Sequence, residues 1–374
     1  MEKTGVLIIG AGQAGLAMGY QLQKYTSRFL LVDGNECIGD SWRKRYDSLL
    51  LFTPRSLSAL PGLELKGDQQ GYASRDEFAG YLEMYARQFD LPIELKTRIT
   101  RLERVNGNFL ASSSDGRQFQ AQVVVLANGG FQKPIVPSLS KNLYSSIQQF
   151  SAESYKNPSQ VQDGTVVVVG DGATGRDIAV ELAASHTVYL ATGKPRRLMP
   201  ERVLGVSMWW WLYKLGLLTA PTESFIGRKM QQVDSFPNRD RGFSALRSKG
   251  IQIMPKLTQA EGNKVTFANG ESVAVNSVVW AMGYQDDSDW IAIPELKDPS
   301  GNFVHQKGVS PVKNLYFIGR PWQTSRASAI ICGVGSDAKL IMDEIIRVPF
   351  PSVVTHSAGL EWSANAHIHS MHPR

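Results

Sequence analysis

The sequence has few of the side chains from which proteins build metal centres and covalent catalytic sites. Its 374 residues include two cysteines, Cys37 and Cys332, which are too few for a disulfide framework or a four-cysteine zinc site. Four of its six histidines lie within the last nineteen residues, which leaves His186 and His305 for the rest of the chain. We therefore expect no metal site and no histidine-based triad, so that a bound cofactor must carry any difficult chemistry.

Long apolar runs and blocks of one charge are also missing. The most apolar stretch, residues 203–218, contains Lys214 and is too short to cross a hydrocarbon core of about 30 Å. Forty Lys and Arg against 34 Asp and Glu give a net charge of +6. We interpret this excess as spread along the chain, which does not indicate a nucleic-acid partner but suits anionic ligands. With no signal-peptide pattern, the composition predicts a cytoplasmic protein of about two globular domains without an integral membrane segment.

A glycine motif is present at the N-terminus. Residues 6–9 form an unbroken apolar run typical of a buried parallel strand, the segment 10–15 follows as GxGxxG, and a helical pattern extends to about residue 24. A second apolar run ends at Asp33, which completes the strand, glycine loop, helix, strand and acid of a dinucleotide site. The helix N-terminus would bind the pyrophosphate, and the acid would accept from the ribose hydroxyls. The predicted contacts are Gly10, Gly12, Gln13, Ala14, Gly15 and Asp33.

The same pattern recurs in the middle of the chain. Residues 165–169 are an apolar strand, a second GxGxxG follows, and a helix is predicted from about Arg176 to Ala184. No acid follows the next strand, residues 188–190, where a basic cluster could instead pair with a 2′-phosphate. This favours NADPH, and an NADH site beside a solvated basic loop is the alternative. The predicted contacts are Gly170, Gly172, Ala173, Thr174, Gly175, Lys194, Arg196 and Arg197.

The repeat extends beyond the glycines. Each half continues into a polar β-meander, residues 98–119 with an Asn-Gly turn at 106–107 and residues 252–272 with one at 269–270. Each meander is followed by an apolar strand and a turn of small residues. Two copies of one topology imply two dinucleotides, and a flavin beside a nicotinamide would allow hydride transfer. The predicted fold class is α/β, with two Rossmann-like dinucleotide-binding domains.

Beyond the glycines, residues 6–346 resemble the class B flavin monooxygenases, in particular the bacterial CzcO-like and plant YUCCA-like branch. Residues 39–43, Gly-Asp-Ser-Trp-Arg, are similar to the family's segment beside the flavin, and residues 47–55 to the stretch that passes the isoalloxazine. Residues 315–319, Leu-Tyr-Phe-Ile-Gly, and the helical segment 328–338 also match the family's pattern.

The resemblance implies FAD in the first site and NADPH in the second. FAD would be reduced by NADPH and would react with O₂ to give a C4a-hydroperoxyflavin. This would oxygenate a small organic substrate at a soft sulfur or nitrogen atom, or at a carbonyl. Thr53 and Gln323 are the candidate catalytic residues, and a monomer or homodimer is expected. Further flavin contacts implied by the resemblance are Gly34, Ser41, Trp42, Ile99, Ala127 and Gly319.

In this family the NADPH domain interrupts the FAD domain. The resemblance therefore implies an FAD-binding domain in two parts, residues 1–160 and 291–350, around an NADPH-binding domain at residues 161–290. Residues 351–374 would form a poorly ordered tail. The family's identifying motif is altered, since Phe150 stands where its histidine is expected. This change leaves an NADPH oxidase that releases H₂O₂ as the alternative function.

Two other features have competing interpretations. A disulfide reductase of the thioredoxin-reductase kind shares the double glycine motif, but it needs a CxxC pair, and the two cysteines here lie in different segments. The cluster Trp209-Trp210-Trp211 is predicted either to form a packing helix, or to line a substrate entrance or dock a membrane surface or partner.

Overall fold

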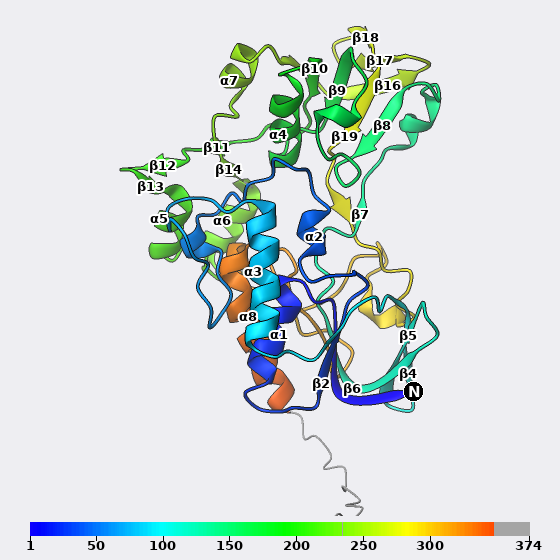
Figure 1. Cartoon of the computed structure of the whole chain (residues 1–374), viewed down its shortest axis with the longest axis vertical. Coiled ribbons are helices and arrows are strands. Elements are labelled where there is room, and N and C mark those ends of the chain that lie inside the picture. Colours follow the sequence, from blue (N-terminus) through cyan, green and yellow to red (C-terminus); the bar gives the residue numbers. More distant parts are fainter. Residues whose placement is uncertain (234, 348–374) are drawn as a thin grey trace, which may run out of the picture.

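The computed structural model of the chain describes residues 1–233 and 235–347. The predicted tail at residues 351–374 lies outside the described residues. The described residues form two main sheets, one in each half of the molecule (Figure 1). Each sheet contains one of the two glycine motifs at the end of a central strand, so the prediction of two Rossmann-like halves is confirmed.

The first sheet has seven strands and contains the N-terminus. Its parallel part is built from long apolar strands, and its antiparallel part is the predicted meander, whose turn has Asn106 and Gly107 at φ 49° and 81°. Residues 6–9 of the first strand are all buried, as the unbroken apolar run predicts. In order across the sheet, the strands are β3 (Ile93–Glu94), β2 (Phe29–Val32), β1 (Glu2–Ile9), β6 (Gln118–Leu126), β5 (Asn108–Ser113) and β4 (Ile99–Val105), with β21 (Leu315–Phe317) also paired to β6.

Three helices cover one face of this sheet, where they appear as neighbours in Figure 1. They are α1 (Gln13–Leu22), α3 (Arg75–Gln88) and α8 (Ile331–Ile346). Helix α3 begins with a capping box, in which Ser74 accepts from the Glu77 N–H and the Glu77 carboxylate accepts from the Ser74 N–H. The other face packs against the meander and against residues 291–317, so the end of the chain returns to the sheet that its beginning formed.

The second sheet is entirely parallel. Its strands, in order, are β15 (Gln252–Met254), β10 (Thr187–Ala191), β9 (Thr165–Val169), β19 (Ser277–Trp280) and β8 (Gln148–Ser151). Strand β8 therefore belongs to this sheet although it precedes the boundary proposed at residue 160. Helices α4 (Ala173–Leu182) and α7 (Phe243–Ser248) and a separate meander of β16 (Leu257–Glu261), β17 (Lys264–Phe267) and β18 (Ser272–Ala274) complete this half.

Two sequence-based bounds in this half were wrong. Helix α4 begins at Ala173 and not at Arg176, because Gly172 is already its N-cap and the first turn includes the glycine motif itself. The second meander begins at Leu257 and not at residue 252, because residues 252–254 extend the parallel sheet beside β10. The predicted Asn-Gly turn at 269–270 does join β17 to β18.

The two halves are held together by more than their linkers. Strands β7 (Lys133–Pro134) and β20 (Tyr284–Gln285), which lie on the two connecting segments, pair with each other. In addition, Tyr46 and Leu49, which follow the short helix α2 (Asp40–Arg43), are buried in the core of the second half beside α4. Residues from the first 50 thus complete a core that belongs to residues 155–281.

A segment made of the described residues 198–233 and 235–237 projects from the side of the molecule (Figure 1). It contains β11 (Leu198–Met199), β12 (Arg202–Val203), β13 (Val206–Ser207), α5 (Met208–Lys214), α6 (Phe225–Val233) and β14 (Phe236–Pro237). We call it the projecting segment. The described residues also form five short 3₁₀ helices, which are η1 (Arg55–Leu57), η2 (Ser138–Asn142), η3 (Pro158–Gln160), η4 (Pro294–Leu296) and η5 (Arg326–Ala329).

Candidate functional site

The first glycine loop connects β1 to α1. Gly10 has φ +108°, and a Cβ on it would lie 2.6 Å from the Ala127 carbonyl oxygen, so only glycine fits this turn. A Cβ on Gly15 would lie 1.9 Å from the Gly10 carbonyl oxygen, which explains the close packing of α1 on the loop. A Cβ on Gly12 would meet no heavy atom within 4 Å. The open edge at Gly12, at the N-terminus of a helix without a side-chain cap, fits the pyrophosphate of a dinucleotide.

The second loop has nearly the same shape. Gly170 has φ +107°, and its Cβ would lie 2.4 Å from the Ala281 carbonyl oxygen. A Cβ on Gly175 would lie 1.8 Å from the Gly170 carbonyl oxygen, whereas Gly172 again faces open space. Ala281 therefore occupies in the second half the place that Ala127 occupies in the first. Ala173 and Thr174 form the first turn of α4, as Gln13 and Ala14 do in α1.

The acids differ between the two loops. Asp33, at the end of β2, accepts from the Ala11 N–H at 2.7 Å and from the Asn35 N–H at 2.8 Å, so it also supports the glycine loop. In the second half the acid is in the loop itself: Asp171 is 3% exposed and accepts from the Gly193 N–H at 3.2 Å. The position after β10 that corresponds to Asp33 therefore carries no carboxylate.

Arg176 and Arg196 surround the acid of the second loop. Arg176 forms an ion pair with Asp171 at 3.1 Å with both side chains buried, and burial lowers the pKa of this guanidinium while the carboxylate opposes that effect. Arg196 lies 3.8 Å from the same carboxylate. Lys194 and Arg197 are exposed on the same loop. The structure therefore groups the three predicted cations at the end of β10 and orients one of them toward the glycine loop.

Helix α2 contacts the first loop through one hydrogen bond. The Trp42 indole N–H donates to the Gln13 side-chain oxygen at 3.2 Å, which joins two predicted flavin contacts that are 29 residues apart. Ser41 is exposed beside Trp42. Gly34 is exposed, and its Cβ would lie 3.1 Å from that of Arg98. Gly319 follows β21, and its Cβ would lie 2.9 Å from that of Ala14, so Gly319 borders the same loop. Ile99, in contrast, is buried in the core beneath the meander.

The two predicted catalytic residues are both buried. The Thr53 hydroxyl is 2.8 Å from the Ser58 hydroxyl, so it already has a partner. The Gln323 side-chain oxygen accepts from the Arg320 N–H at 3.3 Å, and its amide nitrogen is buried without a hydrogen-bond partner. A Cβ on Gly308 would lie 2.4 Å from this nitrogen, which places the carboxamide against the Gly308 turn. The roles of Thr53 and Gln323 in the reaction stay predictions.

The sequence analysis missed a polar cluster at the start of α8. Asp337 is 1% exposed and accepts from the Thr324 hydroxyl at 2.6 Å, while its second oxygen has no partner. Burial raises the pKa of the Asp337 carboxyl, and hydrogen bonds from Thr324 and Ser328 oppose that effect. Ser328 also caps η5 by accepting from the Ser325 N–H at 3.2 Å. No sequence signal marks this carboxyl, because one aspartate in an apolar helix has no periodic pattern.

The analysis also missed the contacts that brace the linkers. Arg320 and Asp286 form a bidentate ion pair with both distances 2.6 Å, next to Gly319 on one side and β20 on the other. The Arg45 guanidinium lies 4.9 Å from the Phe131 ring centre and 5.0 Å from that of Tyr284. Arg320 and Asp286 are 34 residues apart in the chain, and Arg45, Phe131 and Tyr284 are more than 80 residues apart. Only the fold brings them together.

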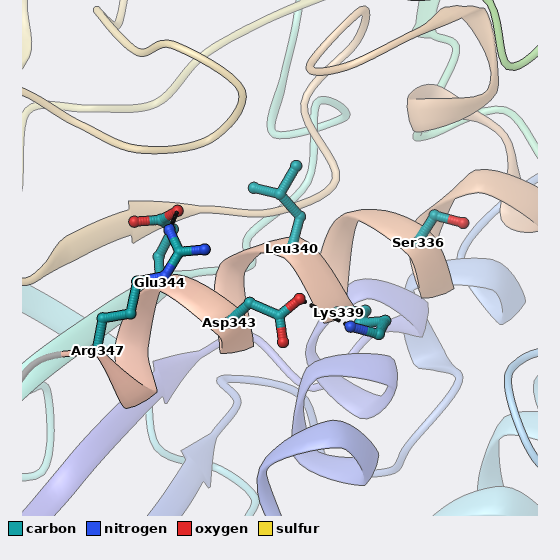
Figure 2. A pocket seen from close by; sticks show the side chains of 6 residues that line it. All are labelled: Ser336, Lys339, Leu340, Asp343, Glu344 and Arg347. Atoms are coloured by element: carbon teal, nitrogen blue, oxygen red, sulfur yellow. Dashed lines mark hydrogen bonds and ion pairs between the residues drawn. The ribbon is translucent and has the colours of Figure 1, made fainter.

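A surface hollow of about 440 Å³ lies along α8, with side chains shown in Figure 2. Its charges satisfy one another: Lys339 pairs with Asp343 at 2.8 Å, and Arg347 pairs with Glu344. Its lining residues belong to α8 or, in the case of Arg347, to the C-cap of that helix, so neither glycine loop contributes to it. The hollow is not the candidate site.

Metal and disulfide chemistry find no support in the described residues. They contain no cluster of three or more His, Cys, Asp or Glu side chains that could hold a metal ion. Both cysteines are free, and burial raises the pKa of the Cys332 thiol to about 12, which disfavours the reactive thiolate.

This geometry, in which each glycine loop follows the carboxyl end of a parallel strand, defines an oxidoreductase with two dinucleotide sites. A family profile described as pyridine nucleotide-disulphide oxidoreductase matches residues 7–204. The CzcO-like oxidoreductase of Geobacillus kaustophilus is 44% identical over 343 residues, which cover 91% of this chain and 98% of the relative. The chain therefore belongs to the pyridine nucleotide-disulphide oxidoreductase family, and within it to the CzcO-like branch of the class B flavin monooxygenases.

More distant proteins agree with this assignment. The YUCCA4 indole-3-pyruvate monooxygenase of Oryza sativa is 24% identical, over 98% of this chain and 91% of its own. The structure of the flavin-containing monooxygenase from Stenotrophomonas maltophilia superposes with a TM-score of 0.78 at 22% identity, and it covers 93% of this chain and 99% of that one. The chain is thus an enzyme, and its relatives are flavin-dependent oxidoreductases and monooxygenases.

Proposed function

We propose that this enzyme is an FAD-containing, NADPH-dependent monooxygenase of small organic substrates. The observation that carries the proposal is the pair of glycine loops. They share one backbone shape and one open edge, but only the first is followed by an acid that can bind a ribose hydroxyl. FAD fits the first loop, and a nicotinamide dinucleotide with a 2′-phosphate fits the second, whose following residues are basic. NADH remains possible at the second loop.

The residues of the chain would bind and orient the cofactor and would exclude water from it. When FAD is bound it supplies the two-electron chemistry that accepts hydride from a nicotinamide and activates O₂. Gly12, Gly15 and the N–H groups of the first turn of α1 would bind its pyrophosphate, and Trp42 would be held in place by Gln13. The apolar cluster around the buried Trp209 would exclude water from the reacting region. Its buried members are Leu57, Trp209, Leu218, Ala327 and Ile330.

The proposed substrates are compounds with a soft sulfur or nitrogen atom or with a carbonyl group. Among the described residues, no conspicuous pair of an acid and a base lies near the first loop, which suits a reaction in which the cofactor and O₂ supply the reacting atoms. The cytoplasmic location and the monomeric or homodimeric state remain predictions. Sedimentation of the yellow protein would measure the second of these.

An NADPH oxidase is the second candidate, and Phe150 is the observation that favours it. Phe150 lies on the edge strand β8 opposite Val279, and its ring contacts the Tyr155 ring edge-on at 6.3 Å between centres. The family's histidine at this place could hydrogen-bond, and this side chain cannot. A poorly held nicotinamide would favour the two-electron reduction of O₂ to H₂O₂ over oxygenation of the substrate.

A single reaction mixture distinguishes the monooxygenase from the oxidase. NADPH consumed, H₂O₂ released and oxygenated product are counted together with a thioether, a tertiary amine and a ketone, under ¹⁸O₂. A monooxygenase gives product that carries one ¹⁸O. If H₂O₂ accounts for all NADPH across the panel, the monooxygenase proposal is wrong and the oxidase is the function.

A further inference from the structure

The projecting segment exposes an unusual number of large apolar side chains. Among the described residues, twenty large apolar side chains are exposed, and seven of these lie between residues 203 and 233. The most exposed are Leu204 at 87%, Phe225 at 77% and Leu215 at 67%. The others are Val203, Tyr213, Ile226 and Val233. Such a concentration of exposed apolar side chains within one segment is typical of a site that contacts another apolar phase.

The segment is nevertheless firmly attached. Trp209 on α5 is 1% exposed and packs against Phe52 with ring centres 5.7 Å apart, so the packing interpretation of this tryptophan is correct. Two backbone hydrogen bonds, Thr222 N–H to Thr324 O and Ala327 N–H to Leu218 O, each 3.0 Å, join the segment to η5 and the residue before its cap. The exposed side chains therefore belong to a segment that is held against the rest of the molecule by packing and by backbone hydrogen bonds.

Cations accompany the apolar side chains. Arg202, Lys214, Arg228 and Lys229 form no ion pair with a carboxylate of the described chain, whereas Glu223 is paired with Lys307. Residues 194–249 contain eleven Lys and Arg against four Asp and Glu, a net charge of +7 that exceeds the +6 of the whole chain. Of this excess, residues 198–237 contribute +1, and the residues that flank the segment at 194–197 and 238–249 contribute +3 each. Our expectation of an even spread along the chain was therefore wrong.

The spacing on α6 puts both properties on one side. Phe225, Lys229 and Val233 are four residues apart, so they lie in one row along the helix, and all three are exposed. Gly227 is buried, and Met230 packs toward Trp209 on the opposite side. At the tip of the β12–β13 hairpin, Leu204 and Gly205 both have positive φ and extend the apolar surface away from the body.

We propose that the projecting segment binds the surface of an anionic phospholipid membrane. Leu204, Leu215 and Phe225 would enter the interfacial region, and Lys214, Arg228 and Lys229 would contact the lipid headgroups. No helix among the described residues is long and apolar enough to cross a membrane, so the contact is with the surface. The segment is hydrogen-bonded to η5, which lies beside the candidate site. Substrates dissolved in the lipid would therefore be close to the candidate site. Binding itself does not depend on the function proposed above.

The test uses the full-length, flavin-loaded protein and sedimenting vesicles. One set is phosphatidylcholine alone, and the other contains about one third phosphatidylglycerol. At about 50 mM NaCl we expect the dissociation constant to be at least about tenfold lower for the anionic vesicles, and this preference to disappear near about 500 mM NaCl because salt screens the attraction.

Variants separate the two contributions. The double variant Leu204→Ser, Phe225→Ser should weaken vesicle binding at least about tenfold. The triple variant Lys214→Gln, Arg228→Gln, Lys229→Gln should lose the preference for anionic lipid. Tyr25→Ser and Tyr144→Ser, at residues 58% and 63% exposed on other surfaces, are the matched controls and should bind as the wild type does.

Three results would overturn the proposal. One is absence of binding to anionic vesicles at low salt, and another is equal binding by the double variant and the wild type. The third is a dimer in sedimentation equilibrium that the Leu204→Ser, Phe225→Ser variant dissociates, without any vesicle binding. That outcome would identify the surface as an interface between two copies of the chain. Flavin content of each variant, measured in parallel, shows whether the fold is retained.

Discussion

Gly12 and Gly15 are three residues apart, but a side chain has different consequences at each. A Cβ on Gly15 collides with the loop, whereas one on Gly12 enters open space where a pyrophosphate would lie. We therefore expect Gly12→Val to fold normally and to be colourless, and Gly172→Val to remain yellow and lose NADPH binding at least about tenfold, or about 1.4 kcal/mol.

Flavin absorbance and NADPH titration measure both outcomes, and circular dichroism establishes the fold. Gly15→Val is the matched control, and it should destabilise the fold because its Cβ meets backbone. A yellow Gly12→Val protein without nicotinamide binding would mean that the two cofactor assignments are reversed.

Variants of the basic loop after β10 test whether this loop makes the enzyme prefer NADPH to NADH. Replacement of Lys194, Arg196 and Arg197 by Ala should raise KM for NADPH by about tenfold or more, about 1.4 kcal/mol, with little effect on NADH. Because Arg196 also lies near Asp171, the double variant Lys194→Ala, Arg197→Ala is the cleaner probe of the phosphate. Equal losses for NADPH and NADH would show that the cluster supports the loop and does not recognise the 2′-phosphate.

Asp337 makes stability depend on pH. Burial raises the pKa of its carboxyl in the folded state above the unfolded value of about 3.9. The neutral acid's contribution to the free energy of unfolding is therefore complete below about pH 4 and is lost as the pH rises through the folded-state pKa. Asp337→Asn still accepts from Thr324 and cannot ionise, so it should lose less stability than the wild type as the pH is raised.

Urea unfolding at a series of pH values measures this difference. Asp343→Asn, on the same helix but at the surface, should follow the wild-type curve apart from the loss of its pair with Lys339. Parallel curves for Asp337→Asn and the wild type would show that folding does not shift the pKa of this carboxyl.

At the scale of elements, the residues that follow α2 join the two halves of the molecule by packing into the core of the second half. Leu49 is 8% exposed and lies in the core of the second half, and its neighbour Leu50 is 42% exposed. Leu49→Ala should lower the free energy of unfolding by about 2–4 kcal/mol, as expected for a buried leucine. Leu50→Ala should change it by about 0.5 kcal/mol or less.

Chemical denaturation of both variants, followed by flavin and tryptophan signals, provides the measurement. The two signals should shift together in Leu49→Ala, because this side chain joins the halves. A shift in only one signal would mean that the halves unfold separately and that the contact contributes to one of them alone.

At the scale of the whole molecule, Phe150 bears on the coupling of NADPH oxidation to oxygenation. It belongs to β8, the edge strand of the second sheet, and has no hydrogen-bonding group. We expect NADPH consumption without substrate to yield H₂O₂, and sulfoxide yields well below one per NADPH. Phe150→His should raise the yield, and Phe150→Leu should not. Near-complete coupling in the wild type would show that other residues replace the histidine.

The sequence alone determined the features that depend on neighbouring residues. The glycine loops, their strands and the Asn-Gly turns could be predicted because positive φ and close backbone approach restrict the residue type at each position. Similarity of the motifs indicated the family, which the comparisons confirmed. The first turn of α4 was missed because the glycine motif itself is helical there.

Only the tertiary structure decided the features that join distant segments. Nothing local shows that Asp33 and Asp171 support their loops from opposite ends, or that Tyr46 and Leu49 complete the core of the other half. Burial of Trp209 beside exposed Leu204 and Phe225 likewise depends on what α5 and α6 pack against. The physical reason is that burial, and the pKa of a group such as Asp337, are set by neighbours far away in the chain, whereas a turn is set by its own residues.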